Sequence, residues 1–365
     1  RFSQIVHYRC RPGSDEHADW GHSPFTFYNI INLFKYGVGI FEDMGGGDFS
    51  GYAGRGLTGL GNLGNSCYLN SCLQVLSHTY ELSELLDNGP RKGGLSRNAD
   101  SLLVTEWNKL RHLMWSDNHT VAPRGFVKAV QRIAGIKGRD LFTGHAQNDA
   151  QEFLLFLIDC FHTAFAREVQ MSVRGEAATP TDELAKACYG MMKEMYIKDY
   201  SELLGIFYGI HISEITTTES DQVLSRKPEP FSVISLPIPS SGPDLCIRDC
   251  FAAYCANEML AGDDAWLNTE TGKRADACRR ITFWSLPEVM IVDLKRWQNN
   301  GRKLRSLVRV PLTGLDLSEY VRGYDSSDHV YDLYATCNHI GGASGGHYTA
   351  NIRNPDGRWY LSTTL

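Results

Sequence analysis

The sequence predicts an α+β fold, because its helical patterns come before its strand patterns. Leu69, Cys72, Leu73 and Leu76 occupy positions i, i+3, i+4 and i+7, which form one apolar face of a helix. After Phe231 the sequence has proline-ended runs and two-residue alternation, which are typical of strands. A chain built from repeated βαβ units would alternate the two patterns instead.

Two more helices and five strands are predicted. One helix begins near Asp149, because Asp149 and Glu152 resemble a capping box, and another covers about residues 182–204. The strands are predicted over residues 234–239, 289–294, 331–337, 348–353 and 358–361. The last two flank Asn-Pro-Asp-Gly, a strong hairpin turn. Residues 25–34 fit either a short helix or a strand.

Composition narrows the class of protein. The 365 residues are 42% hydrophobic and 21% charged, which is typical of a globular protein with one large domain or two ordinary ones. A total of 36 Lys and Arg against 42 Asp and Glu gives a net charge of −6, which disfavours a nucleic-acid partner. The sequence has no apolar run of about 18 residues, so it predicts no membrane span. Nine glycines between residues 45 and 64 predict an interdomain loop.

The ten cysteines raise the question of a nucleophile. None belongs to a Cys-x-x-Cys pair, so most are expected to be small buried residues in a reducing compartment. Cys67 differs, because it starts the first predicted helix after a glycine-rich approach. The helix dipole and free N–H groups favour the nucleophilic thiolate at that position. A buried structural cysteine is the plainer alternative.

Two features near Cys67 and near the end of the chain bear on this chemistry. Residues 59–64 match the dinucleotide-binding pattern G-x-G-x-x-G, but no strand precedes them, so that interpretation is disfavoured.

His347 follows two glycines where a loop meets a predicted strand, which suits a general base that a substrate can approach closely. A structural histidine is again the alternative.

Five motifs, in order along the chain, resemble those of the ubiquitin-specific proteases. Residues 56–71 resemble their cysteine box, and residues 147–154 resemble their Q-Q-D-x-x-E-F/L element. Residues 231–239 resemble a segment after the first half of the fingers, and residues 286–297 resemble L-P-x-x-L-x-x-H-L-K-R-F. Residues 331–360 resemble the histidine box. Parts of these motifs resemble most the subgroup with DUSP and ubiquitin-like modules.

The resemblance implies a papain-like fold with thumb, palm and fingers. It places a catalytic domain over residues 51–365, with the thumb at about 56–204 and the fingers and palm at about 205–365, after a leader of unknown role at residues 1–50. It also implies a thiol-dependent deubiquitinase that acts on ubiquitin and ubiquitinated proteins. We expect such a protein inside the cell, in the cytoplasm or the nucleus, without nucleic-acid or membrane partners.

The resemblance also implies roles for single residues. Cys67 is the expected nucleophile and His347 the general base, while the Asn62 side-chain amide and the Cys67 N–H are the expected oxyanion donors. Asp149 is expected to contact the ubiquitin tail, and a helix N-cap is an equally open role for it. Other residues are expected to line the path of the Gly-Gly tail, namely Tyr348, Gly341, Gly342, Gly345 and Gly346.

The fingers depart from the family pattern. Many members hold Zn²⁺ with two Cys-x-x-Cys pairs, but the matching positions here are Thr217, Ser220, Asn268 and Thr271. Hydroxyl and amide groups are poor zinc ligands beside thiolates. We therefore expect fingers without a metal ion and an enzyme without a cofactor.

The histidine box departs as well. The family places Asp or Asn four residues after Trp359, and that position here is Thr363. A threonine hydroxyl can bond to His347 but brings no negative charge. The missing acid and an apparently truncated C-terminal end leave open a catalytically impaired ubiquitin-binding protein. A papain-like peptidase for another substrate is the third alternative. Asp293 stands where the fourth motif usually has His.

Overall fold

The computed structural model describes most of the chain after residue 28. The described residues are 29–36, 49–88, 94–220, 222–240, 245–268, 271–298, 300–324, 326, 329–342 and 345–363. No helix within these residues is long and apolar enough to cross a membrane.

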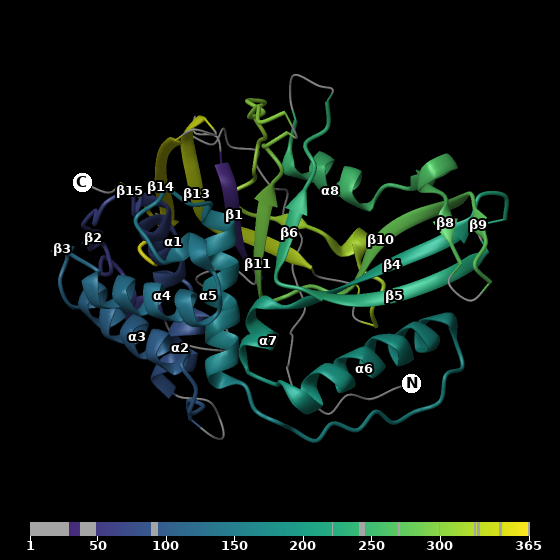
Figure 1. The fold of residues 1–365 in the computed structure, drawn as a ribbon, viewed down its shortest axis with the longest axis horizontal. Helices are drawn as coiled ribbons and strands as arrows, with labels where there is room; N and C mark the ends of the chain where they lie inside the picture. The colour runs from purple at the N-terminus through teal and green to yellow at the C-terminus, as the bar shows by residue number, and fades with distance from the viewer. Residues whose placement is uncertain are drawn as a thin grey trace.

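A seven-stranded sheet lies at the centre of the fold (Figure 1). Its strands run in the order β15 (Trp359–Thr363), β14 (Gly345–Arg353), β13 (Val330–Gly342), β1 (Asn29–Tyr36), β11 (Val289–Leu294) and β6 (Val233–Leu236), with β12 (Leu315–Asp316) paired to β13. Within this sheet, all described pairs are antiparallel except β11 with β6. The sheet therefore combines the last strands of the chain with one strand from its beginning.

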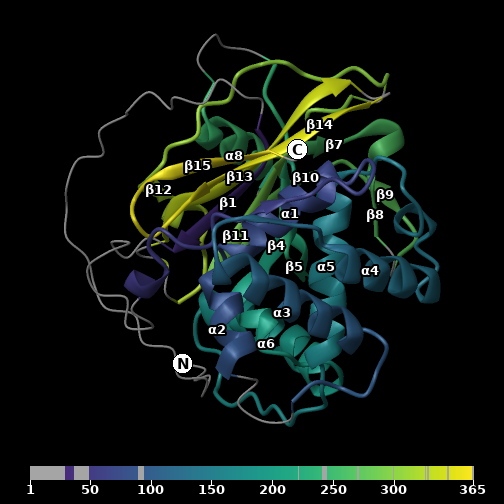
Figure 2. The same cartoon turned by 90° about the vertical axis from the view of Figure 1, so that its left-hand side faces the viewer.

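Five helices form a cluster on one side of this sheet: α1 (Cys67–Ser77), α2 (Tyr80–Asn88), α3 (Ser101–Ser116), α4 (Arg124–Ile136) and α5 (Ala150–Phe165). Every residue of α1 is buried, because the helix is enclosed by other helices and by the sheet. Figure 2 shows β13, β14 and β15 lying over α1. The largest apolar core joins the helices to these strands.

A second, four-stranded sheet extends away from the cluster of helices α1 to α5 (Figure 1). Its order is β5 (Val223–Phe231), β4 (Gly209–Thr217), β10 (Ala277–Ser285) and β7 (Glu258–Leu260). Three more helices lie in this part of the chain: α6 (Pro180–Lys198), α7 (Leu203–Phe207) and α8 (Ile247–Cys255). The helix α6 packs along β5.

The remaining elements are short. Two small sheets pair β2 (Gly59–Leu60) with β3 (Thr120–Val121) and β8 (Trp266–Leu267) with β9 (Arg274–Ala275). Single 3-10 turns cover Phe49–Tyr52, Asp140–Phe142, Gly262–Asp264 and Ser318–Tyr320.

Most predicted elements are confirmed, and the end of one predicted helix is wrong. The helix predicted over residues 182–204 is two helices, α6 and α7. The chain leaves α6 at Asp199 because the backbone of Tyr200 pairs with that of Arg167 through two hydrogen bonds of 3.0 Å. Residues 25–34 contribute to a strand, β1, although residues 25–28 lie outside the described part. This strand belongs to the central sheet, while the predicted domain boundary at residue 51 stays a prediction.

Candidate active site

Cys67 is the first residue of α1. Its side chain is 3% exposed, and the positive end of the helix dipole lies at its thiol. α1 packs against β14, the strand that carries His347. The fold thus brings the predicted nucleophile and the predicted base onto two elements that touch, although 280 residues of sequence separate them.

The side chain of Asn62 organises the loop before Cys67. Its Oδ1 accepts hydrogen bonds from the Gly64 N–H at 3.0 Å, the Ser66 N–H at 3.2 Å and the Ser66 hydroxyl at 3.1 Å. These donors fix which end of the amide is the oxygen. Asn62 is exposed, and no hydrogen bond from its Nδ2 is found within the described residues, so this NH₂ group can donate to a bound substrate.

Two side chains join this loop to the loop before α5. Asn65, which has a left-handed backbone with φ of 51°, donates from Nδ2 to the His145 carbonyl oxygen at 3.0 Å. Asn148 donates from Nδ2 to the Tyr68 hydroxyl at 3.1 Å. Asparagine tolerates the left-handed region better than most residues. These bonds hold the start of α1 against the start of α5.

His347 is half-buried near the beginning of β14. Its Nε2 lies 3.3 Å from the hydroxyl oxygen of Thr363, the last residue of β15. If Nε2–H donates to this hydroxyl, Nδ1 is left as the nitrogen that can exchange a proton. The position predicted for the third catalytic residue therefore does contact the imidazole, and its catalytic role stays a prediction.

Asp149 caps α5. Its carboxylate accepts hydrogen bonds from the Gln151 N–H at 2.8 Å and the Glu152 N–H at 3.1 Å. The N-cap interpretation is thus confirmed, while contact of Asp149 with a substrate tail stays a prediction. The carboxylate is half-buried, so it is not enclosed by the fold.

A second carboxylate, Asp293, lies near Asp149. Asp293 is 6% exposed and stands opposite Ser235 in the parallel pairing of β11 with β6. Gln151, in the first turn of α5, donates from Nε2 to the Ser235 hydroxyl at 2.9 Å. Burial, and then the negative charge of Asp149, raise the pKa of Asp293 to about 7. The sequence marked Asp293 only as a departure from a motif, because nothing local places it beside Asp149.

The glycine-rich start of β14 contacts residues that the sequence did not single out. Gly345 and Gly346 are half-buried, and the carboxamide of Gln147 hydrogen-bonds to Gly346. Tyr348 is 7% exposed, and its ring lies 4.6 Å from that of His339. Burial raises the pKa of Tyr348, so its hydroxyl stays protonated. Gln147 and His339 therefore flank the segment that leads to His347.

Cys72 lies five residues after Cys67 in the same helix and offers a contrast. Its side chain is fully buried, and its thiol donates to the Ala150 carbonyl oxygen at 3.3 Å. Burial raises the pKa of the Cys72 thiol well above its usual value. Cys72 is thus a structural residue, which leaves Cys67 as the nucleophile candidate in α1.

The positions that match the family's zinc ligands in the fingers hold hydrogen-bonded turns. The hydroxyl oxygens of Thr217 and Ser220 lie 2.9 Å apart, and Asn268 Oδ1 accepts from the Thr271 N–H at 3.1 Å. These neutral oxygens do not suit Zn²⁺. Within the described residues no group of three or more His, Cys, Asp or Glu is placed to hold a metal ion. A metal-free protein stays a prediction.

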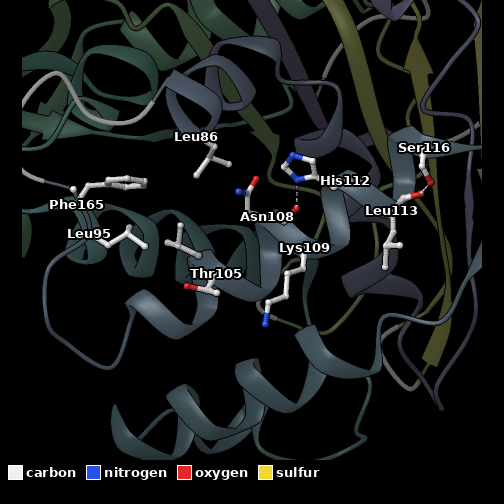
Figure 3. Close-up of a pocket in the computed structure, with 11 residues that line it drawn as sticks. Leu86, Leu95, Thr105, Asn108, Lys109, His112, Leu113, Ser116 and Phe165 are labelled. Atoms are coloured by element: carbon white, nitrogen blue, oxygen red, sulfur yellow. Dashed lines mark hydrogen bonds between the residues drawn. The ribbon is translucent and has the colours of Figure 1, made fainter.

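A surface groove of about 810 Å³ lies beside α3 (Figure 3). Apolar side chains such as Leu86, Leu95 and Phe165 line one part of it. Its polar members include Lys109, which pairs with Glu106 at 2.6 Å. The groove contains neither Cys67 nor His347, so we do not assign the chemistry to it.

Known proteins with similar sequences match most of this chain. The chain is 33% identical over 320 residues to human (Homo sapiens) "Ubiquitin carboxyl-terminal hydrolase 2", with 84% of this chain and 51% of that protein covered. It is 28% identical over 326 residues to "Ubiquitin carboxyl-terminal hydrolase 4" of Saccharomyces cerevisiae, with 81% and 35% covered. The chain spans about half the length of the first of these relatives.

Solved structures share the fold. One is titled "Structure of the SAGA Ubp8/Sgf11/Sus1/Sgf73 DUB module bound to ubiquitin aldehyde" and matches with a TM-score of 0.60 and 21% identity, covering 86% of this chain and 66% of that one. The predicted α+β thumb, palm and fingers architecture is confirmed by this likeness. A family model described as ubiquitin carboxyl-terminal hydrolase matches residues 58–363, from the loop before Cys67 to the last residue of β15. Because this match includes most of the chain and both catalytic candidates, the protein belongs to the ubiquitin carboxyl-terminal hydrolase family.

Proposed function

We propose that this chain is a thiol-dependent deubiquitinase that hydrolyses the peptide or isopeptide bond at the C-terminal glycine of ubiquitin. The observation that carries the proposal is the packing of α1, which begins with Cys67, against β14, which carries His347. The loop before α1 holds the Asn62 oxygen and leaves the Asn62 Nδ2 as a donor. The relatives named above are ubiquitin carboxyl-terminal hydrolases, and the solved DUB module is bound to ubiquitin aldehyde. Both facts support ubiquitin as the partner.

The first half of the reaction forms an acyl-enzyme. The Cys67 thiolate attacks the carbonyl carbon of the terminal glycine, and a C–S bond forms as the carbonyl π electrons move to oxygen. The Asn62 Nδ2 and the Cys67 N–H stabilise this oxyanion. When the intermediate collapses, the C–N bond breaks, and the leaving amine takes a proton from the imidazolium of His347.

The second half releases ubiquitin. Water attacks the thioester carbon while His347 takes one proton from the water, and collapse of the second intermediate expels the Cys67 thiolate. Thr363 accepts a hydrogen bond from the His347 ring in this scheme. Its hydroxyl orients the imidazole but does not offset the positive charge that forms on it.

The test is a ubiquitin probe that carries an electrophile in place of its C-terminal carboxylate. We expect covalent labelling of the wild-type chain at Cys67, identified by peptide mass spectrometry. Cys67→Ala should bind ubiquitin but form no adduct and should not release a fluorophore from the ubiquitin C-terminus. Cys72→Ala is the matched control, since Cys72 lies in the same helix, and it should still be labelled.

The alternative functions give other results. Binding of ubiquitin without labelling would favour a catalytically impaired protein, a possibility raised by the absence of an acid at Thr363. No binding and no labelling, together with cleavage of unrelated peptides, would favour a general papain-like peptidase. Labelling of Cys72 in place of Cys67 would contradict the assignment of the nucleophile.

A further inference from the structure

The side chain of Gln147 makes a two-point contact with the backbone of Gly346. Its Oε1 accepts from the Gly346 N–H at 3.2 Å, and its Nε2 donates to the Gly346 carbonyl oxygen at 3.2 Å. A primary amide thus pairs with this residue much as a neighbouring strand would. The two residues lie 199 positions apart, so the contact joins the loop before α5 to the start of β14.

The opposite side of Gly346 is closed by β13. Gly346 pairs with Gly341, and a Cβ added at Gly346 would collide with the His339 ring and the Ile340 carbonyl oxygen. A lysine, Lys303, donates from Nζ to His339 Nδ1 at 2.8 Å and to the His339 carbonyl oxygen at 2.6 Å. The backbone of Gly346 is therefore packed against a braced ring on one side and held by Gln147 on the other.

The His339 ring is suited to this bracing role. Burial, and then the charge of Lys303, lower the pKa of His339 to about 4, so the ring is neutral near pH 7. A neutral ring can accept the hydrogen bond from Lys303 at Nδ1. The His339 ring is tilted by 41° against that of Tyr348, with the centroids 4.6 Å apart, and Tyr348 follows His347 in the strand. Both neighbours of His347 in the sequence are thus fixed by contacts.

We propose that Gln147 is a positioning residue for His347, acting by holding the Gly346 backbone at the distance that brings the imidazole to Cys67. This inference rests on the proposed function, because it takes His347 as the general base. Gln147 does not exchange protons itself. Its effect comes from geometry, since a displaced base transfers protons poorly.

The first test needs no ubiquitin. We would measure the rate at which iodoacetamide alkylates Cys67 from pH 5 to pH 9, because a well-placed imidazolium keeps the thiolate present at low pH. Gln147→Ala should lower the rate near pH 6 by about 10-fold and leave the rate near pH 9 within about 2-fold. Gln147→Glu keeps the acceptor for the Gly346 N–H but loses the donor, so it should fall between wild type and Gln147→Ala.

A matched control is available one helical turn away. Gln151 also bridges the start of α5 to the central sheet through a side-chain amide, but it bonds to Ser235 in β6 and not to β14. Gln151→Ala should therefore leave the alkylation profile unchanged. Equal changes in both variants, or no change in Gln147→Ala, would overturn the proposal. A general loss of packing would lower the melting temperature of both variants alike.

The second test uses ubiquitin with a C-terminal fluorophore. Gln147→Ala should lower kcat by about 10-fold with KM within about 2-fold, because the base is misplaced while the binding surface remains. A higher kcat/KM in Gln147→Ala would mean that the side chain obstructs the tail, and it would overturn the positioning role. If wild type does not hydrolyse ubiquitin but the alkylation profile still depends on Gln147, the proposed function fails and the positioning role stands.

Discussion

The imidazole Nε2 of His347 lies 3.3 Å from the hydroxyl oxygen of Thr363, across the pairing of β14 with β15. A hydroxyl at this place can orient the ring, as the acid of a catalytic triad does. It cannot stabilise the imidazolium by charge, because it stays neutral. The rate of the chain should therefore be limited by the poor stability of its imidazolium.

We expect Thr363→Asp to raise kcat/KM for ubiquitin with a C-terminal fluorophore. A carboxylate next to Nε2 would stabilise the charged ring, and a gain of about 10-fold corresponds to ~1.4 kcal/mol of transition-state stabilisation. Ser362→Asp is the control, because neighbouring residues of a strand point to opposite faces. An equal gain in Ser362→Asp, or no gain in Thr363→Asp, would mean that residue 363 is not the orienting position.

The Asn62 amide gives a second prediction, in which two substitutions separate its two roles. Asn62→Asp keeps an oxygen that can accept from the Gly64 and Ser66 N–H groups, but it removes the Nδ2 donor and adds a negative charge. We expect kcat to fall by at least about 100-fold, since one oxyanion donor contributes ~2.7–4 kcal/mol. Stopped assays with the fluorogenic ubiquitin substrate would measure this.

Asn62→Ala completes the comparison. It removes both the donor and the acceptor, so it should lose activity and also lower the melting temperature. A melting temperature for Asn62→Asp close to that of wild type would show that the loop survives without the donor. Wild-type kcat in Asn62→Asp would exclude Asn62 as an oxyanion donor.

The sequence predicted the local structure around the candidate site well where the signal is local. The helix that begins at Cys67, the Asp149 cap and the hairpin before Thr363 all depend on residues close together in the chain. The strand from Asn29 to Tyr36 could not be predicted as part of the central sheet, because its partners β11 and β13 lie about 250 residues or more away. Its own residues show no clear period.

The same limit applies to the contacts that tune the site. Gln147 bonds to Gly346 and Asp293 lies near Asp149 only after the helices and the sheet have packed together. No spacing in the sequence encodes those distances. The end predicted for the helix over residues 182–204 was wrong for a related reason, because a non-local backbone pairing of Tyr200 with Arg167 follows the end of α6.

The fingers give a third prediction, on metal content. The purified protein should contain much less than one zinc per chain by elemental analysis, and its melting temperature should not fall in a chelator. The reason is that Thr217, Ser220, Asn268 and Thr271 supply neutral oxygens that already hydrogen-bond within their turns. One zinc per chain that survives dialysis would contradict this.

The buried carboxyl of Asp293 gives the last prediction, on pH and stability. Burial and the nearby Asp149 raise its pKa to about 7, from an ordinary value of 3.8. Between about pH 4 and pH 7 the folded protein therefore binds more protons at this residue than the unfolded chain does. The contribution of Asp293 to the free energy of unfolding should fall as the pH rises through this interval. Above pH 7 this contribution is fully lost.

Asp293→Asn should remove this dependence, because the amide is neutral at every pH. The Ser235 hydroxyl, which hydrogen-bonds to the Asp293 carboxylate, can also bond to the oxygen of the amide. We expect the variant to be more stable than wild type by ~2 kcal/mol at pH 8, and by much less at pH 4, in urea unfolding. Asp316→Asn is the control, since Asp316 is exposed and accepts a turn hydrogen bond from the Ser318 N–H at 2.9 Å. An equal difference at both pH values would mean that Asp293 does not titrate between them.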